Sequence, residues 1–324
     1  MTLNQLEYVL AVAKYGSYKN AALKTTISQP ALSMQILKLE NELGLRIFDR
    51  SNSPLSLTAD GELFLERALE IVTSANRLLE FTTKMNDDLS GEIKLGIIPT
   101  LAPFLVPLFV DQLLKDLPTL KLDIHELVTE RVVNSVRSGE IDAGIISTPI
   151  DVYGIESIPM FYEKFYLYTS DPSLENVDNV LLETINYETL WLLEEGNCFR
   201  DQINNFCDLN KIRKNRQFIY RSNSIDALIR IVDTKGGMTI LPELSTLSLT
   251  ANQEENVKKI AGKPKAREIA LIVRKNHDKE RFIEKIKQYI QSNIPKSMLT
   301  SVGLEIVDPD IKIDYQKSYY RGLD

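Results

Sequence analysis

The feature that most constrains the fold is an alternation of short apolar runs with amphipathic stretches over residues 93–292. Runs rich in β-branched and aromatic side chains are typical of strands, whereas apolar residues that recur three and four positions apart are typical of helices. The predicted strands cover 93–98, 122–127, 143–146, 165–168, 190–193, 218–220, 238–241 and 269–273, and the predicted helices cover 101–117, 130–138, 224–234 and 278–292. This alternation predicts an α/β domain with largely parallel sheets.

The N-terminal residues have a helical pattern instead. Three short helices are predicted: one that ends at Tyr15-Gly16, one capped by Ser17, and one capped by Ser28 that ends at Gly44. The residues predicted to face their shared core are Leu6, Val9, Leu10, Ala13, Ala21, Ala22, Leu23, Leu32, Ile36, Leu39 and Leu43. The last two helices, joined by a tight turn, form a predicted helix-turn-helix, whose second helix enters the major groove of DNA.

The third helix carries polar side chains suited to DNA. The candidate DNA-binding residues on it are Ser28, Gln29, Pro30, Ser33, Gln35 and Lys38. The alternative is that this polar face is only the solvent-exposed surface of the helix. The runs 45–50 and 55–57 flank a turn at 51–54 and predict a small β-wing, on which Arg50 could reach a phosphate.

A long helix is predicted from Thr58 to about Met85. Its apolar residues Leu65, Ala68, Val72, Ala75 and Leu79 are three and four positions apart, which predicts a seam between two copies of the chain. A two-fold pair of DNA-binding heads predicts paired half-sites on the duplex.

The net charge of −7 does not exclude DNA binding, because it is unevenly distributed. Residues 1–60 carry six basic and five acidic side chains, and the acidity therefore lies in the later part of the chain. The sequence has no apolar run of membrane-spanning length and no signal-peptide pattern, so we expect a cytoplasmic protein with no membrane association.

The first quarter of the chain resembles LysR-type transcriptional regulators. The motifs that carry the resemblance are Ala21-Ala22-Leu23, Ser28-Gln29-Pro30-Ala31-Leu32-Ser33, Leu43-Gly44, Phe48 with Arg50, and Leu57-Thr58 with Gly61. The resemblance implies a winged helix-turn-helix domain (1–58), a linker and dimerisation helix with a hinge (59–90), and a regulatory domain like a two-lobe periplasmic binding protein (91–295). Lobe I would comprise 91–163 and 267–295, and lobe II 164–266, followed by a C-terminal extension (296–324) for which the sequence suggests no function.

Both cysteines of the chain lie in one short segment, at Cys198 and Cys207. Asn197 can cap a helix that begins at Cys198, where the helix dipole and the neighbouring Arg200 would favour the thiolate. A regular helix over this interval separates the two Cα atoms by about 13 Å, whereas a disulfide tolerates less than about 7 Å. A bond between them would therefore require the helix to unwind. The alternative is two unrelated buried cysteines that act as small apolar side chains.

The cysteine segment also resembles the redox segment of the OxyR-type peroxide sensors within the LysR family. Gly96-Ile97-Ile98-Pro99-Thr100, His125-Glu126 to Thr129, and Gly196-Asn197-Cys198-Phe199-Arg200-Asp201-Gln202 carry this resemblance, with Gly236 to Pro242 and Arg267 to Leu271 downstream. It implies that Cys198 is the peroxidatic cysteine and Cys207 the resolving one. Thr100 and Thr129 would position the peroxide, and Arg267 would lower the pKa of Cys198. Many of these sensors have histidine where this chain has Asn197, and an amide cannot take up a proton near neutral pH.

The resemblance implies a homodimeric or homotetrameric activator of antioxidant genes that is not an enzyme. Its partners would be promoter DNA, hydrogen peroxide, RNA polymerase, and a glutaredoxin or thioredoxin reductant, with no cofactor. Two other functions stay open: a regulator with a small anionic co-inducer between the lobes, and a thiol peroxidase that bears a DNA-binding head. No metal site is predicted, because the two histidines, His125 and His277, are isolated in the sequence.

Overall fold

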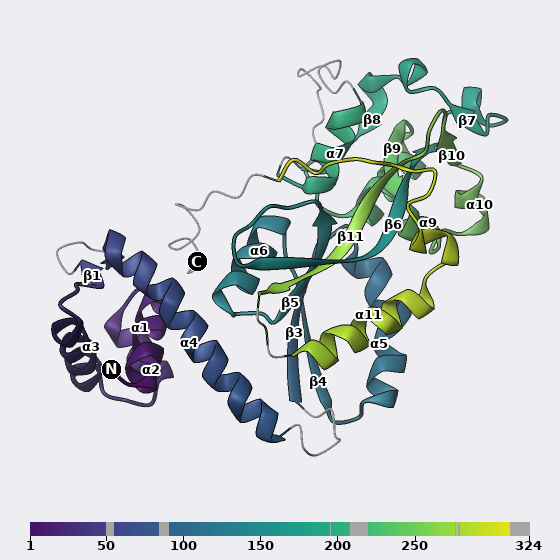
Figure 1. Ribbon diagram of the computed structural model, residues 1–324. Coiled ribbons are helices and arrows are strands. Elements are labelled where there is room, and N and C mark those ends of the chain that lie inside the picture. The colour runs from purple at the N-terminus through teal and green to yellow at the C-terminus, as the bar shows by residue number, and fades with distance from the viewer. Residues whose placement is uncertain are drawn as a thin grey trace. The chain divides into compact units, whose positions relative to one another are not determined.

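The computed structural model describes residues 1–49, 55–83, 91–194, 196–207, 220–275, 277 and 279–311. The chain forms two compact units, one made mainly of residues 1–88 and the other mainly of residues 89–313 (Figure 1). No helix in these ranges is long and apolar enough to cross a membrane.

The first unit is a helical head with a small wing. It contains α1 (Leu3–Tyr15), α2 (Tyr18–Lys24), α3 (Gln29–Leu43), the antiparallel pair β1 (Phe48–Asp49) and β2 (Ser56–Leu57), and α4 (Ala59–Thr83). Ser28 caps α3 by accepting a hydrogen bond from Ala31 N, and Gly16 and Gly44 end α1 and α3 in the left-handed conformation. The three predicted helices are therefore present, although the side chain of Ser17, the N-cap residue of α2, makes no capping hydrogen bond.

Two sets of side chains in the head differ from the sequence prediction. Leu23 is 77% exposed and Leu43 is 39% exposed, so neither lies in the core. Leu65, Ala68 and Val72 of α4 are buried in the core of their own head, so they are not available to form the predicted seam with a second copy. Helical spacing identifies an apolar stripe but not the partner that covers it. The side chain of Leu79 lies outside the described residues.

Gly61 allows the first turn of α4 to pack against the backbone of Ile47, the residue that precedes β1. Its N–H donates to Thr58 Oγ1 at 2.9 Å, and a Cβ at this position would lie 2.1 Å from the carbonyl oxygen of Ile47. We expect Gly61→Ala to lower the free energy of unfolding of the head by about 1–3 kcal/mol, because a backbone oxygen cannot move aside without disturbing the core. Urea unfolding measures this loss. Leu63→Ala is the control, since Leu63 is exposed and its loss is expected to change stability by less than about 0.5 kcal/mol. Equal effects of the two substitutions would contradict the close packing.

The second unit is built on a curled mixed sheet of ten strands, with the main order β4-β3-β5-β11-β6-β10-β7. The strands are β3 (Gly91–Ile97), β4 (Leu120–Glu126), β5 (Ala143–Thr148), β6 (Ile155–Thr169), β7 (Asn179–Val180), β8 (Leu190–Trp191), β9 (Met238–Pro242), β10 (Val257–Ile260), β11 (Lys265–Arg274) and β12 (Glu305–Ile306). The helices are α5 (Ala102–Asp116), α6 (Thr129–Ser138), α7 (Cys198–Phe206), α8 (Ile225–Lys235), α9 (Glu243–Thr246), α10 (Ala251–Glu254) and α11 (Glu280–Asn293). Short 3₁₀ helices lie at Pro172–Leu174, Leu182–Thr184, Tyr187–Thr189 and Lys296–Leu299.

Two long strands join the halves of this sheet. From Ile155 to Lys164, β6 pairs antiparallel with β11; from Phe165 onward it pairs with β9 and β10. The prediction of largely parallel sheets is therefore wrong for the centre of the unit, although β4, β3 and β5 are parallel neighbours. The sequence pattern predicted only residues 165–168 of β6. The first part of β6 was not predicted, because no helix separates it from residues 165–168. Of the strand predicted at 218–220, residues 218 and 219 lie outside the described residues, and Tyr220 has no regular structure.

Candidate functional site

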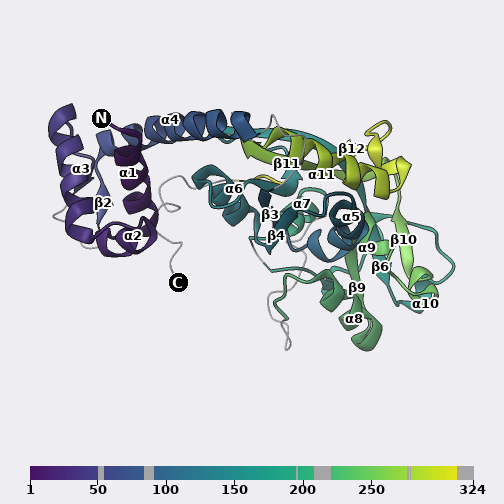
Figure 2. The same cartoon turned by 90° about the horizontal axis from the view of Figure 1, so that it is seen from below.

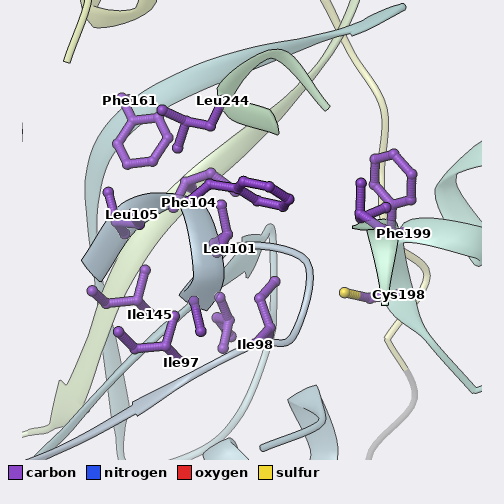
Figure 3. Close-up of a cluster of buried hydrophobic side chains, with 14 of the residues drawn as sticks. Ile97, Ile98, Leu101, Phe104, Leu105, Ile145, Phe161, Cys198, Phe199 and Leu244 are labelled. Atoms are coloured by element: carbon purple, nitrogen blue, oxygen red, sulfur yellow. The ribbon is translucent and has the colours of Figure 1, made fainter. Parts of the chain in front are cut away.

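Helix α7 carries one cysteine at each end. Asn197 caps it by accepting a hydrogen bond from Phe199 N, and Cys207 follows its last residue and donates its N–H to Ile203 O at 2.8 Å. Both cysteines are free thiols, and Cys198 and Cys207 are only 5% and 2% exposed. Figure 3 shows the Cys198 sulfur directed away from its own helix, toward the side where Ile98 and Leu101 lie. A disulfide cannot form while α7 is intact, since its helical rise separates the ends by about 13 Å.

The surroundings of Cys198 come from the ends of parallel strands. Thr100 follows β3, and Thr129 follows β4 as the first residue of α6. Because β3 and β4 are parallel neighbours, their carboxyl ends meet at one edge of the sheet, where ligand sites of α/β sheets form. Both threonines are buried.

A buried ion pair completes this group. Arg267 of β11 donates from Nη1 to Thr100 Oγ1 at 2.9 Å and from Nε to Glu163 Oε2 at 2.9 Å. Its guanidinium lies 4.9 Å from the centre of the ring of Phe199, the residue that follows Cys198 in the sequence. Arg267 and Glu163 are both 0% exposed. Glu163 also accepts a hydrogen bond from Leu244 N at 2.9 Å, so this carboxylate connects the arginine to α9.

Thr129 is the polar group of the site with an open bonding position. Within the part of the chain that the structure describes, its buried Oγ1 has no hydrogen-bond partner of normal geometry. The hydroxyl nevertheless interacts with the Cys198 thiol and lowers the pKa of that thiol. A hydroxyl in this position can donate to a thiolate or to a small polar molecule beside the sulfur. The site therefore has a hydroxyl donor next to its candidate nucleophile.

Burial decides the protonation of Cys198. It raises the pKa of the thiol, against the opposing effects of Thr129, the Arg267 charge and the Phe199 N–H, while the Asp201 carboxylate raises it further. The sequence led us to expect that the helix start favours the thiolate of Cys198, but in this conformation the loss of water outweighs the groups that lower the pKa, which lies above its ordinary value. Sequence reasoning did not single out Glu163, which belongs to no motif that periodicity can detect, and it identified Asp201 as a residue of the helix start without an effect on the pKa of Cys198.

Two predicted residues have other contacts. Arg200 donates from Nη1 to the carbonyl oxygen of Leu193 at 2.8 Å and is not among the groups that shift the pKa of Cys198. Asn197 uses Oδ1 for the cap and donates from Nδ2 to Asn223 Oδ1 at 3.1 Å. Asn197 therefore joins the start of α7 to the loop before α8.

Burial also raises the pKa of Cys207, to about 12, with a partly opposing hydrogen bond from Tyr187. We expect both thiols to react slowly with iodoacetamide at pH 7, and the rates to rise about tenfold per pH unit through pH 9, because alkylation follows the thiolate fraction. Site-resolved mass spectrometry against pH measures this.

The control for that measurement is the protein unfolded in urea, where both thiols titrate near about 8.5. A thiol whose pKa is raised by folding stabilises the fold below its unfolded pKa and loses this contribution as pH rises through the folded value. The urea midpoint of the reduced protein should therefore fall above pH 9. A plateau in the folded alkylation rate below pH 8 would show that burial does not hold the thiols protonated.

The candidate DNA-binding residues lie together on α3. Ser28, Gln29, Pro30 and Lys38 are exposed and Ser33 is half-buried. Gln35 is half-buried, and its Oε1 accepts a hydrogen bond from Gln5 Nε2 at 3.2 Å, so part of its amide is used within the head. Arg50 and the wing turn lie outside the described residues.

The ranges given above contain no group of three or more histidine, cysteine, aspartate or glutamate residues that could hold a metal ion. His125 instead lies 3.2 Å from the Asp123 carboxylate in an exposed pair.

Two family models match the chain. Residues 3–62 match the bacterial regulatory helix-turn-helix proteins of the lysR family, and residues 86–294 match the LysR substrate binding domain. The chain is 32% identical over 277 residues to the HTH-type transcriptional regulator EstR of Acinetobacter baylyi, covering 85% of this chain and 91% of that one. It is also 32% identical over 247 residues to a hydrogen peroxide-inducible genes activator of Pectobacterium carotovorum, covering 76% and 81%. Among solved structures, a full-length OxyR variant from Pseudomonas aeruginosa matches with a TM-score of 0.74 at 29% identity, covering 91% of this chain and 99% of that one.

Proposed function

The chain belongs to the LysR family of bacterial transcriptional regulators, and from this premise we propose that it senses hydrogen peroxide through Cys198 and a disulfide with Cys207. It is a DNA-binding regulator and not an enzyme, which sets the thiol peroxidase aside. One observation carries the proposal: two buried free thiols lie at opposite ends of one helix, and the first interacts with Thr129 and with the charge of Arg267.

The first step of the proposed mechanism is oxidation of Cys198. Its sulfur attacks one peroxide oxygen, the O–O bond breaks, and the products are a sulfenic acid and water. The thiol proton leaves with the second oxygen. Thr129 can donate a hydrogen bond to the bound peroxide, and the Arg267 charge stabilises the anionic form of the sulfur.

The second step joins the two cysteines. The Cys207 sulfur attacks the Cys198 sulfenic sulfur, the S–O bond breaks, and a second water leaves. The pair loses two electrons overall and the peroxide gains them. Because the helix holds the thiols too far apart, α7 must unwind first. A glutaredoxin or thioredoxin would return the disulfide to two thiols by exchange.

The structural change acts on DNA through a symmetric oligomer. In the proposed arrangement each chain has a DNA-binding head (1–58), a linker helix (59–90) and a two-lobe regulatory domain (91–295). The Ser28 to Lys38 face of α3 would contact paired half-sites. Oxidation would alter the spacing of the heads, and the oligomer would then engage RNA polymerase at antioxidant genes.

A DNase I footprint on promoter DNA tests the proposal. The reduced wild-type protein and the protein treated with one equivalent of peroxide should give different footprints, and reduction should restore the first. Cys198→Ser should give the reduced footprint under both conditions. A footprint that peroxide leaves unchanged in the wild type would rule the proposal out.

One observation favours a second candidate function. The chain is as similar to a regulator named EstR as to the peroxide-inducible activators, so a small anionic co-inducer in the interlobe cleft is the alternative. A thermal-shift screen of carboxylates separates the two. A ligand that raises the melting temperature strongly and changes the footprint of Cys198→Ser would favour the alternative.

A further inference from the structure

The C-terminal extension has a defined place beside the redox helix. After the turn at Lys296–Leu299, β12 adds to the edge of β11 in parallel, and Val307 N donates to Ala266 O at 2.8 Å. The chain then runs past α7, as the yellow segment of Figure 1 shows. Val307 and Pro309 are buried although the segment is at the end of the fold. These contacts fix residues 305–310, here called the C-terminal clasp, against the domain.

The clasp binds α7 between the two cysteines. Gln202 is fully buried, donates from Nε2 to Val307 O at 2.7 Å, and accepts from Ser147 Oγ at 3.3 Å. One turn later, Asn205 donates from Nδ2 to Asp308 O and to Asp310 Oδ2, both at 2.8 Å. Two side chains of the helix that must unwind are thus held by one segment.

The backbone of the clasp is shaped for these bonds. Asp310 has a φ of +48°, in the left-handed region, and its N–H donates to Asp308 Oδ1 at 2.8 Å. This turn directs the Asp308 carbonyl oxygen and the Asp310 carboxylate to the same amide of Asn205. A left-handed aspartate is uncommon and is retained where neighbouring contacts compensate for its strain.

From these contacts we propose that the C-terminal clasp positions α7 in its helical form and so sets how readily Cys207 reaches oxidised Cys198. The inference rests on the proposed peroxide-sensing function. The hydrogen bonds from Gln202 and Asn205 are specific to the folded helix, so they stabilise the reduced state relative to the disulfide state. Weakening the clasp therefore shifts the redox equilibrium toward the disulfide.

A matched pair of substitutions tests this inference. Asn204 and Asn205 are adjacent and exposed on α7, and of these two it is Asn205 that donates the described hydrogen bonds to the clasp. In both positions alanine raises helix propensity, which opposes unwinding. Relative to Asn204→Ala, Asn205→Ala should move the equilibrium constant in a thiol redox buffer toward the disulfide by about tenfold, the value expected for one or two lost hydrogen bonds.

A double-mutant cycle assigns the effect to the clasp. Asp310→Gly removes the carboxylate but keeps the left-handed backbone accessible. It should shift the equilibrium in the same direction as Asn205→Ala, and the double variant should shift it by less than the sum of the two. Additive shifts would show that the two residues act separately.

Hydrogen exchange of the reduced protein gives a readout that does not depend on the sensing function. The α7 amides of Asn205→Ala should exchange about tenfold faster than those of Asn204→Ala. If the wild type forms the disulfide but all variants share its equilibrium constant and exchange rates, the clasp proposal is wrong, and the proposed sensing function is unaffected. If the wild type forms no disulfide, the sensing function fails, and equal exchange rates would then overturn the clasp as well.

Discussion

Replacing Cys198 with serine is expected to abolish the reaction of the protein with hydrogen peroxide. A serine hydroxyl lacks the polarisable sulfur and does not act as a nucleophile toward peroxide. The other groups of the site, Thr129 and Arg267, would still be present. Stopped-flow consumption of peroxide, or loss of free thiol with time, measures the effect. The fold should be retained, because serine occupies nearly the same volume in the first turn of α7.

Cys207→Ser is the matched control for this result. It leaves Cys198 and its neighbours unchanged, so the first oxidation should proceed and stop at the sulfenic acid, which dimedone traps as a stable adduct. In a parallel reaction without dimedone, excess peroxide should oxidise the sulfenic acid further to the sulfinic acid. If Cys198→Ser consumed peroxide at the wild-type rate, another group would be the site of reaction, and the role given to Cys198 would be wrong.

The second large effect concerns the buried ion pair. Arg267→Met keeps an unbranched side chain but removes the guanidinium, so it leaves the Glu163 carboxylate buried without its counter-charge and Thr100 Oγ1 without its donor. Loss of one partner of a buried pair costs about 3–5 kcal/mol. We therefore expect chemical unfolding of the second unit at a clearly lower urea concentration than in the wild type.

An exposed pair in the same unit provides the comparison. Arg131 and Glu140 lie 3.3 Å apart and are 38% and 43% exposed, so Arg131→Met should cost less than about 1 kcal/mol. Adding Glu163→Gln to Arg267→Met should recover part of the loss, because no buried charge remains unpaired. Equal unfolding midpoints for Arg131→Met and Arg267→Met would contradict the buried pair.

The sequence was sufficient to predict the redox helix. A capping amide at Asn197, an early acidic Asp201 and apolar residues at helical spacing all favour a helix that starts at Cys198, and α7 begins at that residue. The helix-turn-helix was predictable for the same reason, since caps and glycine ends are local signals. These elements depend on residues close to each other in the chain.

The electrostatics of the site could not be predicted in this way. The pKa of Cys198 depends on its burial between segments around Thr100, Thr129 and Arg267, which meet only after β3, β4 and β11 form one sheet. Glu163 lies in the part of β6 that the pattern did not predict. Its effect on Arg267 spans 104 positions of the chain.

The attachment of the C-terminal extension could not be predicted from the sequence for a related reason. It contains few aliphatic residues, and its attachment uses backbone hydrogen bonds of β12 and two amides of α7. The bond from Gln202 to Val307 spans 105 positions. Composition measures the capacity to form a core, whereas this segment is held by polar contacts whose partners lie elsewhere in the sequence.

The most direct test is peptide mapping of the non-reduced wild-type protein after one equivalent of hydrogen peroxide. We expect one linked pair of peptides that joins Cys198 to Cys207 within a single chain and separates on treatment with a thiol reductant. Recovery of both cysteines as unlinked peptides, whether as free thiols or with Cys198 oxidised alone, would contradict the unwinding of α7 and the switch that depends on it.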